Sequence, residues 1–426
     1  MIHYYSTSGK AEKVTFAEAL FQGLAPDGGL YFPEEMPTFT AEELEALKGA
    51  SLQEVGFQVL QKWFGAEIPR EALRPLAYAA QNFPIELNEV GPFQMLEMFH
   101  GPTMAFKDVA AQNLSRLMSH FLSEMNKEIT LLVATSGDTG GAIAHGFADV
   151  PHIKVYVLFP KGRVSGLQEE QLTRTAANVH PIEIDGYFDD CQAMVKQAFT
   201  DPDLAGLSLT SANSISIGRL IPQIIYYVYS YAVLQRDDLE FVVPSGNVGN
   251  ITAGLFAQAM GVPIKNFIAA TNANDVAVRY QDTAIYDPHE TVATLSNAMD
   301  VGNPSNFVRV LELFGHDYET FRDKIQAYKV SDEETIATMK RVYDEHGYLL
   351  DPHTAVGWLI AERHGSDGTI VVSTASPIKF AEEISRTTGL SVADDEAIAA
   401  LQTRPKRKTS LPNDYNTFKA HLLANA

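Results

Sequence analysis

A lysine set among small and apolar side chains is the residue whose type and setting first indicate chemistry. Lys107 lies near the end of the segment HGPTMAFKD, residues 100–108, directly before a predicted helix over residues 109–125. Partial burial and a helix N-terminus both disfavour the ammonium form, so they lower the pKa of the amine and suit it to forming a Schiff base. Most lysines are solvated, and the segment also fits a surface lysine followed by Asp108 as a helix cap.

Two glycine-rich loops each follow a predicted strand and lead into a predicted helix, an arrangement that binds anions. The loops are ATSGDTGGA, residues 134–142, and PSGNVGNIT, residues 244–252. Glycines allow close approach of the backbone, and in the first loop Ser136, Thr139 and free amides can donate to a carboxylate or phosphate. A plain strand-to-helix turn is the alternative for each loop, because such turns are common in α/β proteins. Both loops lack the lysine of a Walker loop and the three-glycine dinucleotide spacing, which disfavours nucleoside triphosphates and NAD.

A fourth polar segment, STASPIK over residues 373–379, places hydroxyl groups where a predicted strand over residues 369–372 ends. Its spacing of Ser376 and Lys379 also occurs in penicillin-binding enzymes, but the companion motifs S-D-N and K-T-G are absent and short matches arise by chance. The motifs H-E-x-x-H, C-x-x-C and G-x-S-x-G are absent too, so zinc hydrolases and α/β-hydrolases lack support. We therefore expect no metal site.

The elements that must position these segments are short strands alternating with helices. This alternation predicts a parallel sheet with helices on its faces, and ligands bound where the strands end. An N-terminal module precedes the strands, and in it Thr40 and Glu43 form the capping box of a helix to about residue 48. Further helices are predicted over residues 52–64 and 69–80. The predicted strands are residues 130–134, 153–159, 180–184, 240–243, 267–270 and 369–372.

Composition and charge exclude several classes of protein. The 426 residues predict two to three domains at about 150 residues each. The net charge of −21 disfavours nucleic acid and acidic membranes as partners, so an anionic substrate requires basic side chains gathered in a cleft. The single cysteine, Cys191, and residues 1–10, which do not resemble a secretory signal, favour the cytoplasm. Residues 404–408, RPKRK, are predicted to be a solvated surface patch.

In order and spacing, these segments resemble the fold type II pyridoxal-phosphate enzymes, and within them the threonine synthases of the longer type with an extra N-terminal module. The resemblance runs nearly end to end and rests on residues 27–30 (DGGL), 100–108, 135–142, 244–250 and 373–377. It implies an α/β fold of two open, mostly parallel twisted sheets flanked by helices, as in the tryptophan synthase β subunit. The implied divisions are an N-terminal α+β module, a smaller lysine-bearing lobe and a larger lobe for the cofactor phosphate, over residues 1–95, 96–215 and 216–426.

The resemblance also implies the cofactor, pyridoxal 5′-phosphate, and the residues that hold it. Lys107 is then the residue that binds it covalently and afterwards moves protons at the α and β carbons of the substrate. Thr374 is expected at the pyridine nitrogen, with Ser373 as a close competitor, because neighbours on a strand point to opposite faces. The residues expected at the cofactor phosphate are Gly246, Asn247, Val248, Gly249 and Asn250.

The substrate implied in this way is O-phospho-L-homoserine, which reacts with water by γ-elimination and β-addition to give L-threonine and phosphate, the last step of threonine biosynthesis. Ser136, Asp138 and Thr139 are expected near the substrate carboxylate or the ring hydroxyl of the cofactor. The related sulfur-amino-acid synthases usually have Asn where Asp138 stands, which leaves its role open.

Basic and polar side chains for the substrate phosphate come from two segments. The first choice is Asn213, Ser214 and Arg219, and the alternative is Lys161 and Arg163. Phosphate ligands in so acidic a protein are expected to be few and local.

Two other functions fit the same segments. One is a related fold type II lyase, either a phospho-lyase or a threonine or serine dehydratase, which shares the cofactor site and yields a 2-oxo acid. The other is a non-catalytic metabolite-binding module, against which the intact motif around Lys107 argues. In each case the expected partner is a small molecule.

Overall fold

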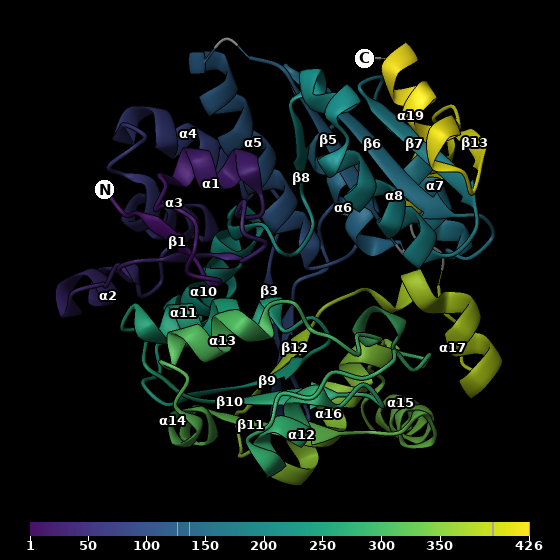
Figure 1. Cartoon of the computed structure of the whole chain (residues 1–426). Coiled ribbons are helices and arrows are strands. Elements are labelled where there is room, and N and C mark those ends of the chain that lie inside the picture. The colour runs from purple at the N-terminus through teal and green to yellow at the C-terminus, as the bar shows by residue number, and fades with distance from the viewer. Residues whose placement is uncertain (126, 136, 394–395, 426) are drawn as a thin grey trace.

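The computed structural model describes residues 1–125, 127–135, 137–393 and 396–425, and within them two large sheets form two lobes (Figure 1). The larger sheet has the order β11-β10-β9-β12-β4-β3, and all its pairs are parallel except β3 with β4. Its strands are β3 (Glu86–Val90), β4 (Phe93–Glu97), β9 (Leu239–Pro244), β10 (Ile264–Thr271), β11 (Ile325–Lys329) and β12 (Ile370–Ser373).

The smaller sheet has the order β13-β7-β6-β5-β8 and is parallel throughout. Its strands are β5 (Ile129–Ala134), β6 (Ile153–Pro160), β7 (Val179–Asp185), β8 (Leu209–Ser211) and β13 (Thr409–Pro412). The mixed α/β fold with two mostly parallel sheets is thus confirmed. Each of the six predicted strands is present, and their bounds differ by a few residues at most.

Helices cover the sheets and join the two lobes. Those of the smaller lobe and its C-terminal extension are α5 (Lys107–Met125), α6 (Asp138–Gly146), α7 (Gly166–Thr173), α8 (Phe188–Thr200), α18 (Glu396–Gln402) and α19 (Tyr415–Ala424). Those of the larger lobe are α10 (Ile224–Leu234), α11 (Gly249–Ala259), α12 (Val276–Thr283), α13 (Phe307–Leu313), α14 (Tyr318–Lys324), α15 (Asp332–His346), α16 (Pro352–His364) and α17 (Ala381–Thr388). Short helical turns complete the chain: α9 (Ile217–Leu220), η1 (Pro202–Leu207), η2 (Ile221–Gln223), η3 (Asn297–Met299) and η4 (Pro377–Phe380).

The N-terminal residues pack against both lobes instead of forming a separate body (Figure 1). They form the antiparallel pair β1 (Tyr4–Ser6) and β2 (Tyr31–Pro33) with helices α1 (Phe16–Gln22), α2 (Ala41–Leu47), α3 (Leu52–Phe64) and α4 (Arg70–Ala80). Phe16 contacts Phe121 of α5, and Trp63 stacks on Phe256 of α11. The predicted capping box of Thr40 and Glu43 is present and opens α2.

The chain crosses between the lobes at places that a linear division does not show. The hairpin β3–β4 joins the larger sheet ahead of the smaller lobe, and β13 returns to pair with β7 of the smaller sheet. The division of the chain into three parts at residues 95 and 215 stays a prediction. The strand order shows in addition that the chain crosses between the two sheets at these two places. The basic run at residues 404–408, predicted to be solvated, is paired to the smaller lobe, since Lys406 and Lys408 both contact the carboxylate of Glu169.

Candidate active site

The loop before α5 is held against the end of β12, which places Lys107 beside Thr374. Phe106 N–H donates to the Thr374 carbonyl at 2.8 Å, and Ser376 N–H donates to the Met104 carbonyl at 3.1 Å. Met104 has a φ of 55°, an uncommon conformation for a residue other than glycine. Lys107 is the first residue of α5, and its side chain is 15% exposed. It is therefore not the solvated surface lysine that the sequence also allowed.

Asp108 fixes this loop from inside. Its carboxylate accepts from Thr103 N–H at 2.9 Å and from the Thr103 hydroxyl at 2.5 Å. A Cβ on Gly101 would lie 2.5 Å from an Asp108 carboxylate oxygen, so the loop closes around this group. Burial raises the pKa of Asp108 to about 6, although the Thr103 hydrogen bonds oppose the rise. Asp108 thus shapes the turn that presents Lys107.

The first glycine loop brings a carboxylate to Lys107. Asp138 begins α6 after Gly137, whose φ of 141° is one that glycine adopts readily, and its Oδ2 lies 3.8 Å from Lys107 Nζ. Burial lowers the pKa of Lys107 to about 8, while Asp138 opposes this shift. The turn is closed by the Thr135 hydroxyl, which accepts from two amides of the loop. Thr139, in the first turn of α6, is partly exposed, and Ser136 lies outside the described residues.

The second glycine loop has the features of an anion site. Val248 precedes α11 with a φ of 50°, which is strained for a β-branched residue and frequent at functional sites. Asn250 is buried, and its Oδ1 accepts from the Tyr227 hydroxyl at 2.7 Å. Its Nδ2 has no hydrogen-bond partner among the described residues. An unused buried donor beside the N-terminus of an eleven-residue helix fits a phosphate.

Asn247 connects the two lobes. Its Nδ2 donates to Ser214 Oγ at 2.5 Å, and its Oδ1 accepts from Ser305 N–H at 2.6 Å and from the Ser305 hydroxyl at 2.9 Å. Both polar atoms of this side chain therefore have protein partners. The contact also brings Ser214, predicted for the substrate, to the loop predicted for the cofactor.

Arg219 is a buried basic residue of this region. It is 3% exposed, its Nη1 donates to the Ala212 carbonyl at 2.9 Å, and its buried Nε has no hydrogen-bond partner in the described part of the chain. Burial lowers the pKa of Arg219 to about 10, and its charge in turn lowers the pKa of Lys107. Lys161 and Arg163 are exposed, and the Arg163 guanidinium lies over the ring of Tyr187. The structure thus places Arg219 near Lys107.

The hydroxyls at the end of β12 have different surroundings. Ser373 Oγ lies 3.0 Å from Thr354 Oγ1, whose hydroxyl also contacts the Asp351 carboxylate. Thr374 is the next residue after Ser373, and its backbone carbonyl accepts a hydrogen bond from the loop that carries Lys107. These contacts favour Thr374 over Ser373 as the residue that faces a ligand.

Sequence reasoning missed several residues that shape the site. Asn306 and Arg309 bind the carbonyls of Ser214 and Ile215, at 3.2 Å and 2.7 Å, and so fix the loop before Arg219. The Tyr226 hydroxyl donates to the Phe106 carbonyl from α10. Lys379, which the chance S-x-x-K match contained, bonds to Asp138 Oδ1 at 2.8 Å. The run NPSN over residues 303–306 is a turn signal that could have indicated the first of these.

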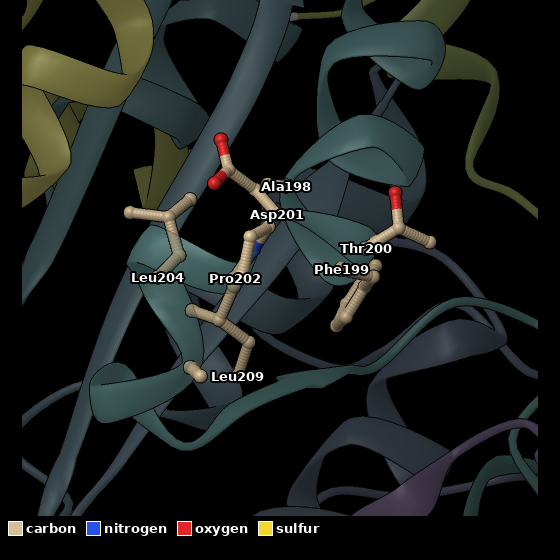
Figure 2. A pocket seen from close by; sticks show the side chains of 8 residues that line it. Ala198, Phe199, Thr200, Asp201, Pro202, Leu204 and Leu209 are labelled. Atoms are coloured by element: carbon tan, nitrogen blue, oxygen red, sulfur yellow. The ribbon is translucent and has the colours of Figure 1, made fainter.

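Two other features hold clustered polar groups, and the second includes His100 of the loop that leads to Lys107. A pocket of about 250 Å³ lies where α8 meets η1, with Thr200 and Asp201 among its lining residues (Figure 2). The Asp201 carboxylate accepts from the Tyr415 hydroxyl at 2.7 Å and lies 2.9 Å from Lys419 Nζ. Among the described residues, Glu86, Glu97 and His100 form a group whose potential metal-ligand atoms all lie within 4.8 Å of one another. Its shortest contact is the 2.8 Å pair of His100 with Glu97, whose hydrogen bond raises the pKa of His100.

Gly246 is expected to be the most sensitive backbone position of the second loop. A Cβ there would lie 2.6 Å from Met299 Cα, so Gly246→Ala must displace backbone and is expected to cost about 1–3 kcal/mol, as overpacking does. Urea unfolding measures the loss, and titration with pyridoxal phosphate is expected to show weaker binding. Gly166→Ala is the matched control, because nothing lies within 4 Å of its Cβ. Equal unfolding midpoints for the two variants would contradict the predicted clash.

Comparisons with known proteins identify the family of this chain. Family models described as threonine synthase N terminus, pyridoxal-phosphate dependent enzyme, and threonine synthase C-terminal match residues 3–80, 79–376 and 354–422. The chain is 40% identical to a threonine synthase of Escherichia coli, with 97% of this chain and 98% of that protein covered.

Solved structures give the same result. The crystal structure of a threonine synthase from Brucella melitensis with pyridoxal phosphate bound matches with a TM-score of 0.94 at 36% identity, covering 99% of both chains. That of the Escherichia coli threonine synthase matches with a TM-score of 0.91 at 38% identity, covering 100% of both.

Proposed function

This chain belongs to the threonine synthase family of pyridoxal-phosphate-dependent enzymes, and from this premise we propose which role each site residue has in the reaction. The enzyme is a carbon–oxygen lyase that converts O-phospho-L-homoserine and water to L-threonine and inorganic phosphate. The single observation that carries the proposal is the setting of Lys107: its loop is bonded to Thr374, its Nζ lies 3.8 Å from Asp138 Oδ2, and the charge of the buried Arg219 acts on it.

The residues present fit pyridoxal phosphate. The unused Asn250 Nδ2 and the amides that open α11 suit its phosphate, which the loop of Gly246, Val248 and Gly249 would hold from its backbone. Thr374 would lie at the pyridine nitrogen, where a hydroxyl, unlike a carboxylate, does not enforce protonation of the ring. When bound, the cofactor withdraws electrons from the substrate carbon atoms that lose protons.

Lys107 performs the proton transfers in this scheme. Its burial favours the neutral amine, which is the form that attacks an aldehyde and accepts a proton from carbon. The amine is then the general base at the α carbon and returns protons along the substrate. Because α5 and the bridge between Ala105 and Ala375 hold the backbone beside it, the side chain moves while its anchor stays in place.

Arg219 is the proposed ligand of the substrate phosphate, with Asn213 and Ser214 in the same loop. Its guanidinium is buried with a free N–H, so a phosphate offers the acceptor that the described protein atoms do not. Asp138 and Thr139 begin α6, with the substrate carboxylate expected at the amides there. Asn247 is proposed to support the cofactor phosphate through its loop, since its side chain contacts Ser214 and Ser305.

The location and partners are also part of the proposal. We place the enzyme in the cytoplasm with a small-molecule substrate and without nucleic acid or membrane, on the acidic composition and the single buried Cys191. No helix in the described part of the chain is both long enough and apolar enough to cross a bilayer.

The test of the function is a product assay. The purified enzyme with pyridoxal phosphate is incubated with O-phospho-L-homoserine, and threonine, phosphate and 2-oxobutanoate are quantified. We expect threonine and phosphate in equal amounts. Phosphate with 2-oxobutanoate would indicate a phospho-lyase instead. No phosphate release would indicate a dehydratase if threonine or serine is converted to a 2-oxo acid, and a binding module if it is not.

A further inference from the structure

A second lysine, Lys379 of η4, lies fully buried behind the residues assigned above. Its side chain is 0% exposed, and its ammonium group is surrounded by oxygen atoms. Nζ lies 2.8 Å from Asp138 Oδ1, donates to the Thr103 carbonyl at 2.8 Å and donates to Gln171 Oε1 at 3.2 Å. Three acceptors match the three N–H groups of an ammonium, so the hydrogen-bonding capacity of the Lys379 side chain is filled.

Asp138 is shared unequally between the two lysines. Its Oδ1 receives Lys379 Nζ at 2.8 Å and Gln168 Nε2 at 3.0 Å, whereas its Oδ2 lies 3.8 Å from Lys107 Nζ. The first two contacts are hydrogen bonds, and the third is longer than one. Burial alone raises the pKa of Asp138, but Lys379 and then Lys107 outweigh it and hold this pKa below its usual range.

A buried carboxylate beside the reactive amine is otherwise a disadvantage. An opposite charge at about 4 Å favours the ammonium form of a lysine, and the ammonium neither attacks an aldehyde nor accepts a proton. With Lys379 in place, the negative charge is already neutralised from the other side. The same contact ties Thr103, which orders the Lys107 loop through Asp108, to η4 behind Thr374.

We propose that Lys379 is a positioning residue that retains the charge of Asp138 and so leaves the Lys107 amine free to act as nucleophile and base. The inference rests on the role proposed above for Lys107. In this arrangement Asp138 and Lys379 form a neutral pair beside Lys107. The pair orients the Lys107 side chain, but Asp138 does not serve as the counter-ion of a Lys107 ammonium group. The other charged or titratable groups around Lys107 are Arg219 from α9, Tyr226 from α10 and Asp108 on α5 itself.

The test measures Lys107 directly, without turnover. The full chain freed of cofactor is pulsed with acetic anhydride at a series of pH values, and the labelling of each lysine is quantified by mass spectrometry. Since only the neutral amine reacts, the wild-type midpoint for Lys107 is expected at about pH 8. In Lys379→Met the midpoint is expected to rise by about one pH unit or more, because Asp138 then has Lys107 as its remaining cation. Exposed Lys265 is the internal control.

Two further variants separate charge from packing. Lys379→Arg keeps the charge and is expected to keep the wild-type midpoint. The double variant Lys379→Met with Asp138→Asn removes the whole pair and is expected to return the Lys107 midpoint to the wild-type value or below. A purely structural role for Lys379 would not give this reversal. An unchanged or lower midpoint in folded Lys379→Met overturns the inference.

Removing one member of a buried ion pair leaves the other charge uncompensated, so Lys379→Met can fail to fold. Asp138→Asn then carries the test, because it leaves the Lys379 charge unbalanced and is expected to lower the Lys107 midpoint below that of the wild type. No change there overturns the inference. Failure of the proposed function gives a different result, namely a wild-type chain whose Lys107 does not take up pyridoxal phosphate.

Discussion

Replacing Lys107 by alanine is expected to abolish the visible absorption of the cofactor-loaded enzyme and to lower threonine formation by roughly 10³-fold or more, since general acid–base catalysis alone contributes about 10²–10⁴-fold. The variant removes the covalent link to the cofactor and the base in one change. Spectroscopy of the dialysed protein and a fixed-time assay of threonine measure both effects. Pyridoxal phosphate is still expected to bind reversibly, because the loop before α11 is untouched.

Lys265→Ala is the control for this experiment, because that lysine is exposed on β10 in the larger lobe. It is expected to keep full absorption and activity. Retention of the visible band in Lys107→Ala would mean that another lysine carries the cofactor. The buried Lys379 is then the first alternative, and labelling by borohydride reduction followed by peptide mapping would identify it.

Local sequence patterns were sufficient to predict the framework of the lobes. The strands at residues 130–134 and 153–159 are mainly apolar runs that are buried except at Lys154, and the capping box of Thr40 and Glu43 needs only neighbours in sequence. Five strands of the two large sheets were not predicted: β3, β4, β8, β11 and β13. Of these, β8 and β13 have only three and four residues, and β13 becomes a strand by pairing with β7, more than 200 positions earlier in the chain.

The same limit explains which parts of the site were missed. Lys107 and the loop at residues 244–252 were found because glycine, hydroxyl and amide residues cluster in the sequence beside predicted strands. Lys379 gave no such signal, since its function depends on oxygen atoms of Thr103 and Asp138, which the fold alone brings to it. Arg219 was selected as one of several basic residues, and its burial with an unused N–H is what separates it from Arg163.

The contacts between lobes also explain how binding of one ligand is expected to influence the other. Asn247 lies in the loop proposed for the cofactor phosphate and is bonded to Ser214 in the loop proposed for the substrate phosphate, while Asn306, the N-cap of α13, holds the latter loop. A phosphate bound at the N-terminus of α11 therefore fixes the segment that carries Arg219. This coupling favours cofactor binding before substrate binding, with the substrate site completed by a loop that is already ordered.

Arg219→Met is expected to reduce kcat/KM for O-phospho-L-homoserine by roughly 10- to 100-fold, since a hydrogen bond to a charged group is worth about 1.5–3 kcal/mol. Most of the loss is expected in KM if the guanidinium binds the substrate phosphate equally in the ground and transition states. Inhibition by inorganic phosphate is expected to weaken in parallel, while the visible absorption of the bound cofactor stays. Steady-state kinetics and phosphate inhibition measured on the same preparation check both effects.

Arg163→Met decides between the two groups of basic residues that the sequence offered. Arg163 is exposed and lies over Tyr187, so its removal is expected to leave KM and phosphate inhibition unchanged. Arg219→Lys keeps a positive charge but loses the planar set of donors, so it is expected to recover part of the affinity lost in Arg219→Met. If Arg163→Met weakens substrate binding and Arg219→Met does not, the phosphate binds at the loop after β6 instead. The buried Nε of Arg219 makes the opposite result the expected one, because a phosphate oxygen would supply the acceptor that the described protein atoms do not.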